Sequence, residues 1–112
     1  MSPADQVRLR HMLEAAEKIT AFTAGCERVD LDRDEKLALA VVRLMEICGE
    51  AAKAIPQSIR DANPHVPWSL IGRTRDRLIH GYFNVDLDIV WQIVTTDIPP
   101  LIRAIEEILA QP

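Results

Sequence analysis

Hydrophobic residues recur along this chain at steps of three and four, the spacing that places side chains on one face of an α-helix. The first such stripe, from about Asp5 to Thr23, consists of Val7, Met12, Ala15, Ala16, Ile19 and Phe22. Gly25 follows the stripe, and glycine commonly ends a helix. The pattern therefore predicts a first helix that stops near Gly25.

A second apolar stripe begins near Asp30–Asp34, where several carboxylates suit the positive end of a helix. Its members are Leu37, Val41, Leu44, Met45, Cys48, Ala52 and Ile55. Pro56 ends the stripe, because proline has no amide hydrogen and its ring clashes with the preceding helical turn. We expect one long helix here.

The segment that follows, QSIRDANPHVP (57–67), is polar and contains two prolines, so it is expected to be a loop. Pro67 suits the first turn of the next helix, because the amide that proline lacks would have no helical partner there. A third helix is expected over WSLIGRTRDRLIH (68–80), ending at or near Gly81.

The last apolar stripe opens at NVDLD (84–88) and comprises Ile89, Val90, Ile93, Val94, Ile98, Leu101, Ile102, Ile105, Ile108 and Leu109. The pair Pro99-Pro100 interrupts it, and we expect a kink or a short break there. Four amphipathic segments with short connections predict an all-α protein, an up-and-down antiparallel four-helix bundle. The length of 112 residues suits a single domain over residues 1–112.

Composition narrows the possible functions. The net charge of −4 argues against a surface that coats nucleic acid, although it leaves room for a small basic cleft. No apolar run approaches the about 20 residues needed to cross a membrane. The N-terminus lacks the features of a signal peptide, so we expect a cytoplasmic protein without a membrane partner. Cys26 and Cys48 have no metal-binding spacing; we expect reduced thiols, Cys48 in the core, and neither a metal nor a cofactor.

The stretch RTRDRLIHGYF (73–83) concentrates charge on the expected third helix. Arg73 and Arg77 are four residues apart and share a face, whereas Arg75 lies about 200° away from both. That opposite face is the apolar stripe, which is made of Trp68, Ile71, Leu78, Ile79 and Tyr82. A guanidinium on a buried stripe is costly unless it is paired. Arg75 therefore either pairs with a carboxylate of the second helix, Glu46 or Glu50, or faces a cleft that binds an anion.

Three further side chains surround this arginine in the sequence. His80 follows Arg75 by five residues, about 140° around a helix, so the two share a face only if the helix end near Gly81 is distorted. Asp76 is four residues before His80 and can orient its ring. Tyr82 lies along the face of Arg75. Arg75, His80 and Tyr82 together offer a cation, an acid/base for neutral pH and a phenol, which suit metal-independent cleavage of RNA. This reaction is one option among several for an anion-binding cleft.

The segment RDRLIHGYF (75–83) resembles the Arg-x4-His-x-Tyr pattern of HepT-like toxins of the HEPN superfamily. Asp76 stands where that pattern usually has a polar residue, often asparagine. The resemblance continues in RLMEICGEAAKAI (43–55), in VPWSLIGRTRDRLIHGYF (66–83) and in VDLDIVWQIVTTDIPPL (85–101), so it covers nearly the whole chain.

The resemblance implies a HEPN-like bundle that forms a homodimer, with two Arg/His sites in a shared cleft. It implies a metal-independent endoribonuclease, the toxin of a type VII toxin–antitoxin pair. Arg75 would bind the phosphate, His80 would transfer protons and Asp76 would support the site. The antitoxin would be an MNT-type nucleotidyltransferase that transfers AMP to Tyr82.

Two interpretations remain beside these roles. Arg73 and Arg77 are either weak RNA-binding residues or ordinary solvated charges. The whole chain is alternatively a non-catalytic dimeric subunit that binds a nucleotide or a partner and works with a nucleotidyltransferase. The acidic isoelectric point of about 5.3 slightly favours that alternative.

Overall fold

A computed structural model describes residues 1–68, 71 and 85–111 of the chain. The elements, in chain order, are α1 (Pro3–Thr23), α2 (Asp30–Arg33), α3 (Glu35–Lys53), α4 (Gln57–Ala62), α6 (Leu87–Gln92), the π-helical turn η1 (Ile93–Asp97) and α7 (Ile98–Ala110). No strand occurs among these residues, which confirms the all-α prediction. The expected third helix falls mainly on residues 69–70 and 72–84, outside the described part.

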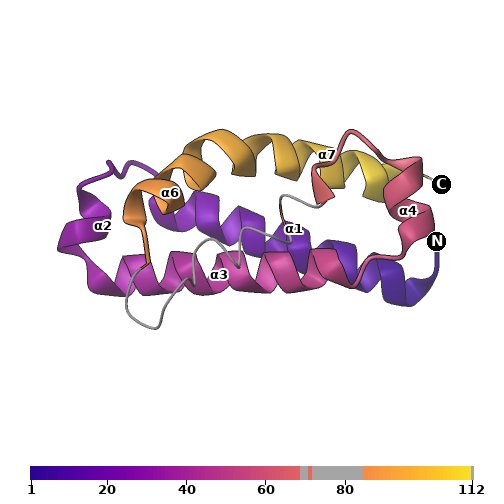
Figure 1. The fold of residues 1–112 in the computed structure, drawn as a ribbon, viewed down its shortest axis with the longest axis horizontal. Helices are drawn as coiled ribbons and strands as arrows, with labels where there is room; N and C mark the ends of the chain where they lie inside the picture. The colour runs from indigo at the N-terminus through magenta and orange to yellow at the C-terminus, as the bar shows by residue number, and fades with distance from the viewer. Residues whose placement is uncertain (69–70, 72–84, 112) are drawn as a thin grey trace.

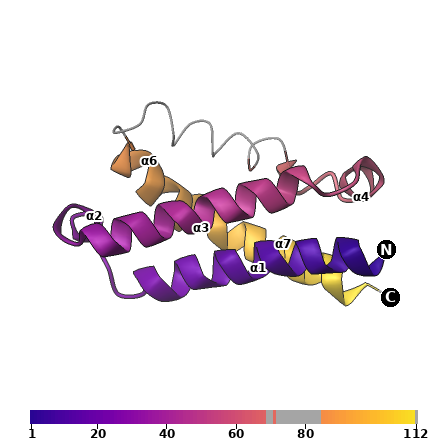
Figure 2. The same ribbon diagram turned by 90° about the horizontal axis from the view of Figure 1, so that it is seen from below.

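Three long rods form the described bundle (Figure 1). α1 runs antiparallel to α3, and it also runs antiparallel to the continuous rod made of α6, η1 and α7 (Figures 1 and 2). The two chain ends consequently lie at the same end of the molecule (Figure 1). This alternation of direction is that of the expected up-and-down bundle.

The first helix has the expected extent and a clear signal at each end. The Ser2 hydroxyl accepts a hydrogen bond from the amide of Asp5 at 3.2 Å, and Pro3 occupies the first turn. After the helix, Gly25 has a φ of 75°, a left-handed conformation that glycine adopts at low cost. The prediction of a stop near Gly25 is confirmed.

The second stripe forms the long helix α3, which begins where it was expected. Asp34 has an extended backbone, and its Oδ1 accepts a hydrogen bond from the amide of Leu37 at 3.1 Å. It therefore caps α3 and separates it from the short α2. The long helix and its start near Asp30–Asp34 are confirmed, and the short α2 that precedes it was not predicted.

The predicted loop over residues 57–67 was wrong for its first half, where α4 forms. Arg60 on α4 donates from Nε to the carbonyl of Ile55 at 2.9 Å, and from Nη2 to the carbonyls of Ala52 and Lys53 at 3.0 and 2.8 Å. These carbonyls lie at and just beyond the end of α3, where backbone amides no longer serve every carbonyl. The polar character of the segment thus reflects its work at a helix end rather than an absence of structure.

The last rod changes its hydrogen-bond pattern just before the prolines and remains helical through them. The amide of Ile98 donates to the carbonyl of Ile93, five residues back, which makes η1 a π-helical turn. Pro99 and Pro100 lack amide hydrogens, and one extra residue in the preceding turn accommodates them within a continuous rod. The break expected at Pro99-Pro100 does not occur; a π turn immediately before the prolines takes its place.

The core lies where α1 meets α3 and α7. Its fully sealed side chains, each at most 2% exposed, include Leu9, Met12, Ala16, Ile19, Leu31, Val41, Val90, Ile105 and Ile108. Cys48 is buried as predicted, and both cysteines are free thiols. Burial raises the pKa of the Cys48 thiol to about 12, because the charged thiolate would be desolvated. No helix among the described residues is long and apolar enough to cross a membrane.

Candidate active site

The residues singled out by the sequence all fall in one stretch, and that stretch is outside the described residues. They are Arg73, Arg75, Asp76, Arg77, His80 and Tyr82. Their roles stay predictions. The structure describes the chain segments that precede and follow the stretch, and a pocket that Ile71 lines.

The chain enters the stretch from an anchored turn. Trp68 is 8% exposed, and its indole Nε1 donates to the carbonyl of Asn63 at 3.0 Å. The side-chain amide of Asn63, itself buried, donates to the carbonyl of Ile59 at 2.9 Å. The amide of Ile71 donates to the carbonyl of Pro67 at 3.0 Å, so a helical turn begins at Pro67 as expected.

The chain leaves the stretch at an equally well-defined helix start. Asp86 caps α6, because its Oδ1 accepts from the amides of Asp88 and Ile89 at 2.9 and 3.3 Å. Arg28 connects this start to α2, through Nε to Asp88 at 2.8 Å and through Nη1 to Asp32 at 3.0 Å. The hydrogen bond to Asp88 raises the pKa of the Arg28 guanidinium, although these surface ion pairs are solvated and weak.

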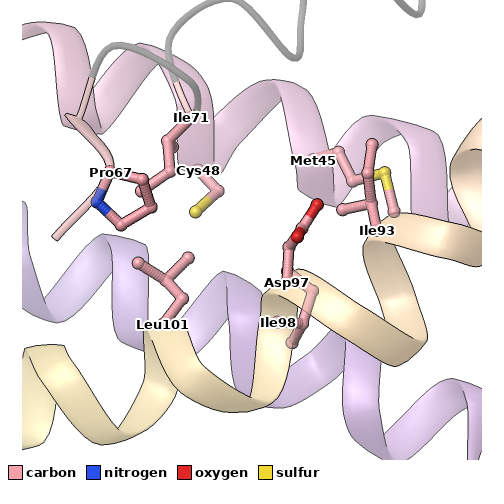
Figure 3. Close-up of a pocket in the computed structure, with 8 residues that line it drawn as sticks. All are labelled: Met45, Cys48, Pro67, Ile71, Ile93, Asp97, Ile98 and Leu101. Carbon is pink, nitrogen blue, oxygen red and sulfur yellow. The ribbon is translucent and has the colours of Figure 1, made fainter.

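A pocket lies between α3, the turn at Ile71 and the η1–α7 part of the last rod (Figure 3). It encloses about 420 Å³, including its opening to solvent. The described residues that line it are Met45, Cys48, Pro67, Ile71, Ile93, Asp97, Ile98 and Leu101. Asp97 is the single charged residue among them, and Figure 3 shows its carboxylate reaching from the last rod toward α3.

Sequence analysis missed Asp97, although the signal that drew attention to Arg75 was present. Ile93, Asp97 and Leu101 follow one another at four-residue steps, so the carboxylate occupies a position where the stripe calls for an apolar residue. The sequence analysis interpreted this region only through the effect of Pro99-Pro100 on the backbone. Asp97 is a candidate site residue that only the packing of the rods reveals.

The two carboxylates proposed as partners of Arg75 both lie on α3. Glu46 accepts a hydrogen bond from Nη1 of Arg43 at 3.1 Å, and Glu50 is exposed. The choice between a paired Arg75 and an anion-binding Arg75 stays open, since Arg75 lies outside the described residues. Within the described ranges, no group of three or more His, Cys, Asp or Glu residues is arranged to hold a metal ion.

Comparison with known proteins identifies the family of the chain. A profile of the family described as "Ribonuclease HepT-like" matches residues 12–108, a range that contains the whole stretch 73–83. A protein named "Probable ribonuclease HepT" from Thermococcus cleftensis is 43% identical over 93 residues, which cover 83% of this chain and 84% of the relative.

Two further relatives match over most of their length. "Putative RNase MJ0127" from Methanocaldococcus jannaschii is 38% identical over 96% of this chain and 90% of its own. "Putative RNase TTE0752" from Caldanaerobacter subterraneus subsp. tengcongensis is 39% identical over 90% of both chains. No solved structure was found to match. The all-α bundle and the match over residues 12–108 together show that the chain belongs to the Ribonuclease HepT-like family.

Proposed function

We propose that this protein is a metal-independent endoribonuclease that uses Arg75 and His80. The observation that carries the proposal is the family match over residues 12–108, which contains both residues. The names of the relatives support it, since three of them are named as ribonucleases or RNases. Asp76 supports His80, and Arg73 and Arg77 attract RNA by charge.

The chemistry follows from the properties of these side chains. The 2′-hydroxyl of RNA attacks the adjacent phosphorus, its proton passes to a base, and the 5′-oxygen leaves with a proton from an acid. His80 serves in proton transfer, because imidazole is the side chain best suited to act as acid or base near neutral pH. Arg75 binds two phosphate oxygens and stabilises the charge that builds on them in the transition state. The products are a 2′,3′-cyclic phosphate and a 5′-hydroxyl.

We further propose that the protein is the toxin of a toxin–antitoxin pair and acts as a homodimer. The five-residue spacing of Arg75 and His80 supports a shared site, in which each subunit contributes one of the two residues. An MNT-type nucleotidyltransferase would inactivate the toxin by moving AMP from ATP to Tyr82, with release of pyrophosphate. AMP on this tyrosine adds a bulky anion beside Arg75 and competes with the RNA phosphate.

The catalytic proposal is tested with purified protein and RNA in the presence of EDTA. The wild type should cleave RNA and leave 2′,3′-cyclic phosphate ends. His80→Ala and Arg75→Gln should each lower the rate by about 10²–10⁴-fold. His11→Ala is the matched control, because His11 is exposed on α1 and distant in sequence from the motif. Cleavage that survives in His80→Ala would show that the catalytic assignment is wrong.

The modification proposal has an unusually clear test, because Tyr82 is the only tyrosine of the chain. Intact mass should rise by whole AMP units after incubation with the nucleotidyltransferase and ATP, and RNA cleavage should stop. Tyr82→Phe should neither gain mass nor lose activity under the same treatment. A mass increase that persists in Tyr82→Phe places the modification elsewhere.

The second candidate function is a non-catalytic subunit that binds a nucleotide or a partner. The net charge of −4 favours it, since it weakens attraction to RNA. This candidate predicts a stable complex with the nucleotidyltransferase and no RNA cleavage by the wild type at any protein concentration. Size-exclusion chromatography of the mixture and the same RNA assay distinguish the two.

A further inference from the structure

The outer face of α1 carries apolar side chains that the described part of the chain leaves uncovered. Val7 is 48% exposed and Phe22 is 49% exposed. The opposite face of the same helix supplies the core residues Leu9, Met12 and Ile19. A helix with apolar residues on both faces is usually covered on both. The outer face of α1 is therefore a candidate contact surface.

Four exposed residues form one row on this face, and we call this row the outer stripe. Its members lie within about 80° of one another around the helix axis, and they are Val7, Glu14, Lys18 and Phe22. A groove beside the middle of the outer stripe, where α1 lies along α3 (Figure 2), encloses about 310 Å³ with its opening to solvent. The groove is lined by His11, Glu14, Ala15, Lys18, Leu44 and Ile47. Apolar side chains of α3 thus extend the surface that the outer stripe presents.

The two apolar ends of the outer stripe are placed symmetrically. Val7 precedes Glu14 by seven residues, and Phe22 follows Ala15 by seven residues. A two-fold axis that passes between Glu14 and Ala15 would therefore bring Val7 of each copy against Phe22 of the other. The stripe is complementary in shape and apolar character to a second copy of itself that runs in the opposite direction.

The charges of the outer stripe fit the same arrangement. With the axis between Glu14 and Ala15, Glu14 lies about 4.5 Å along the helix axis from Lys18 of the second copy. Among the described residues, neither Glu14 nor Lys18 forms an ion pair or a side-chain hydrogen bond, although helical spacing would allow them to pair with each other. The two Glu14 carboxylates approach each other at the axis, and the lysines on both sides offset this repulsion.

We propose that the outer stripe is an isologous interface, at which α1 packs antiparallel against α1 of a second copy of this chain. Val7 and Phe22 bury each other at both ends of the contact, and Leu44 and Ile47 border its middle. The contact is independent of the proposed ribonuclease function, because no residue of the outer stripe belongs to the motif of Arg75 and His80. A copy that also shares its catalytic site with a neighbour belongs to an assembly larger than a dimer.

The first test is the mass of the protein in solution, measured by sedimentation over a range of concentrations. Phe22→Glu and Val7→Glu should each raise the dissociation constant of the contact by about thirtyfold or more, because a charge replaces an apolar side chain at its end. The mass of the assembly should then fall by about half. Leu39→Glu is the matched control, because Leu39 is 62% exposed on α3 and lies outside the outer stripe.

All three variants change exposed side chains, so they should keep the helix content of the wild type in circular dichroism. The control should keep the wild-type mass as well. This comparison separates a lost contact from a lost fold.

The second test exchanges the charges. Glu14→Lys sets two lysines against each other across the contact, and Lys18→Glu sets two glutamates against each other. Each variant alone should therefore associate about tenfold more weakly than the wild type. A mixture of the two variants should associate again, because the lysines of one copy then face the glutamates of the other. Effects within a single helix are not repaired by mixing, so a mixture that stays dissociated contradicts the antiparallel arrangement.

Three further results would overturn the interface. One is a wild-type protein whose mass neither Phe22→Glu nor Val7→Glu changes. The second is a mass that falls in Leu39→Glu and stays unchanged in Phe22→Glu, which assigns self-association to another face of the bundle. The third is binding of the nucleotidyltransferase that Phe22→Glu abolishes without changing the mass of the protein alone. That result assigns the outer stripe to a different protein instead of a second copy.

Discussion

The last rod meets its neighbours in two very different ways. Along the closed seam, defined as the contact of α7 with α1, Ile105 and Ile108 are at most 1% exposed and no charge intervenes. Along the open seam, defined as the contact of η1 and the start of α7 with α3, the side chains leave a pocket that contains Asp97. Both seams belong to one amphipathic rod. Its stripe carries isoleucines at the closed seam and includes an aspartate at the open seam.

The difference shows how one helix can serve stability at one end and a site at the other. Along the closed seam the stripe of α7 is apolar and enclosed, as at Ile105 and Ile108. On the open seam a carboxylate stands at a core position, beside a π turn of the kind often found at functional sites. A departure from the apolar pattern thus marks the open seam.

The largest expected effect contrasts two residues of α7 four positions apart. Ile105→Ala should lower the free energy of unfolding by about 4 kcal/mol, because the side chain is fully enclosed. Leu101→Ala should cost about 2 kcal/mol, because Leu101 borders the pocket and loses fewer contacts. Urea unfolding measures both. Equal costs would remove the distinction between the seams.

A smaller effect separates aspartates that cap helices from the one that does not. Asp34→Ala should lower the free energy of unfolding by about 1 kcal/mol through loss of the bond to Leu37. Asp34→Asn should be nearly silent, since asparagine caps equally well. Asp97→Ala should leave the free energy of unfolding unchanged or raise it, since no described residue donates a hydrogen bond to this carboxylate. Parallel thermal melts decide whether the two sites differ in this way.

The reactivity of the two thiols tests how accessible the open seam is to solvent, because Cys48 lines its pocket. At pH 8, native protein should react with a thiol reagent at Cys26 only, and at both cysteines in urea. Cys48 is buried, and burial raises its pKa to about 12 from an ordinary value of 9.0. Rapid reaction of two thiols in the native state would indicate that the pocket opens more widely than the structure shows.

The same thiol has a consequence at alkaline pH. Because the folded pKa is the higher one, the stabilising contribution of the protonated thiol is complete below pH 9 and is lost as the pH rises toward 12. The melting temperature of the wild type should therefore fall more steeply over this range than that of Cys48→Ala. Cys26→Ala should follow the wild type.

The smallest effect concerns the ion pairs at the start of α6. Arg28→Gln should leave the melting temperature unchanged at physiological salt, because Arg28 and both of its partners are solvated. Asp86→Ala should lower it measurably, because the cap of α6 is lost. If Arg28→Gln lowers the melting temperature as much as Asp86→Ala, the ion pairs hold this end of the open seam.

Much of the fold was predictable because its causes are local in the sequence. The first helix with its stop at Gly25 and the burial of Cys48 were confirmed. The errors arose where a side chain serves a neighbouring element. The segment that forms α4 was expected to be a loop, although Arg60 on it binds the end of α3, and the short α2 before the cap Asp34 was not predicted.

The sequence by itself determined which faces of the helices are apolar and which residues carry the family pattern. Both depend only on the spacing of residues along the chain, and this includes the motif of Arg75, His80 and Tyr82. The tertiary structure alone decided that Asp97 faces a pocket beside Ile71 rather than capping a helix. The physical reason is that a carboxylate is placed by what surrounds it, and rods distant in sequence supply those surroundings.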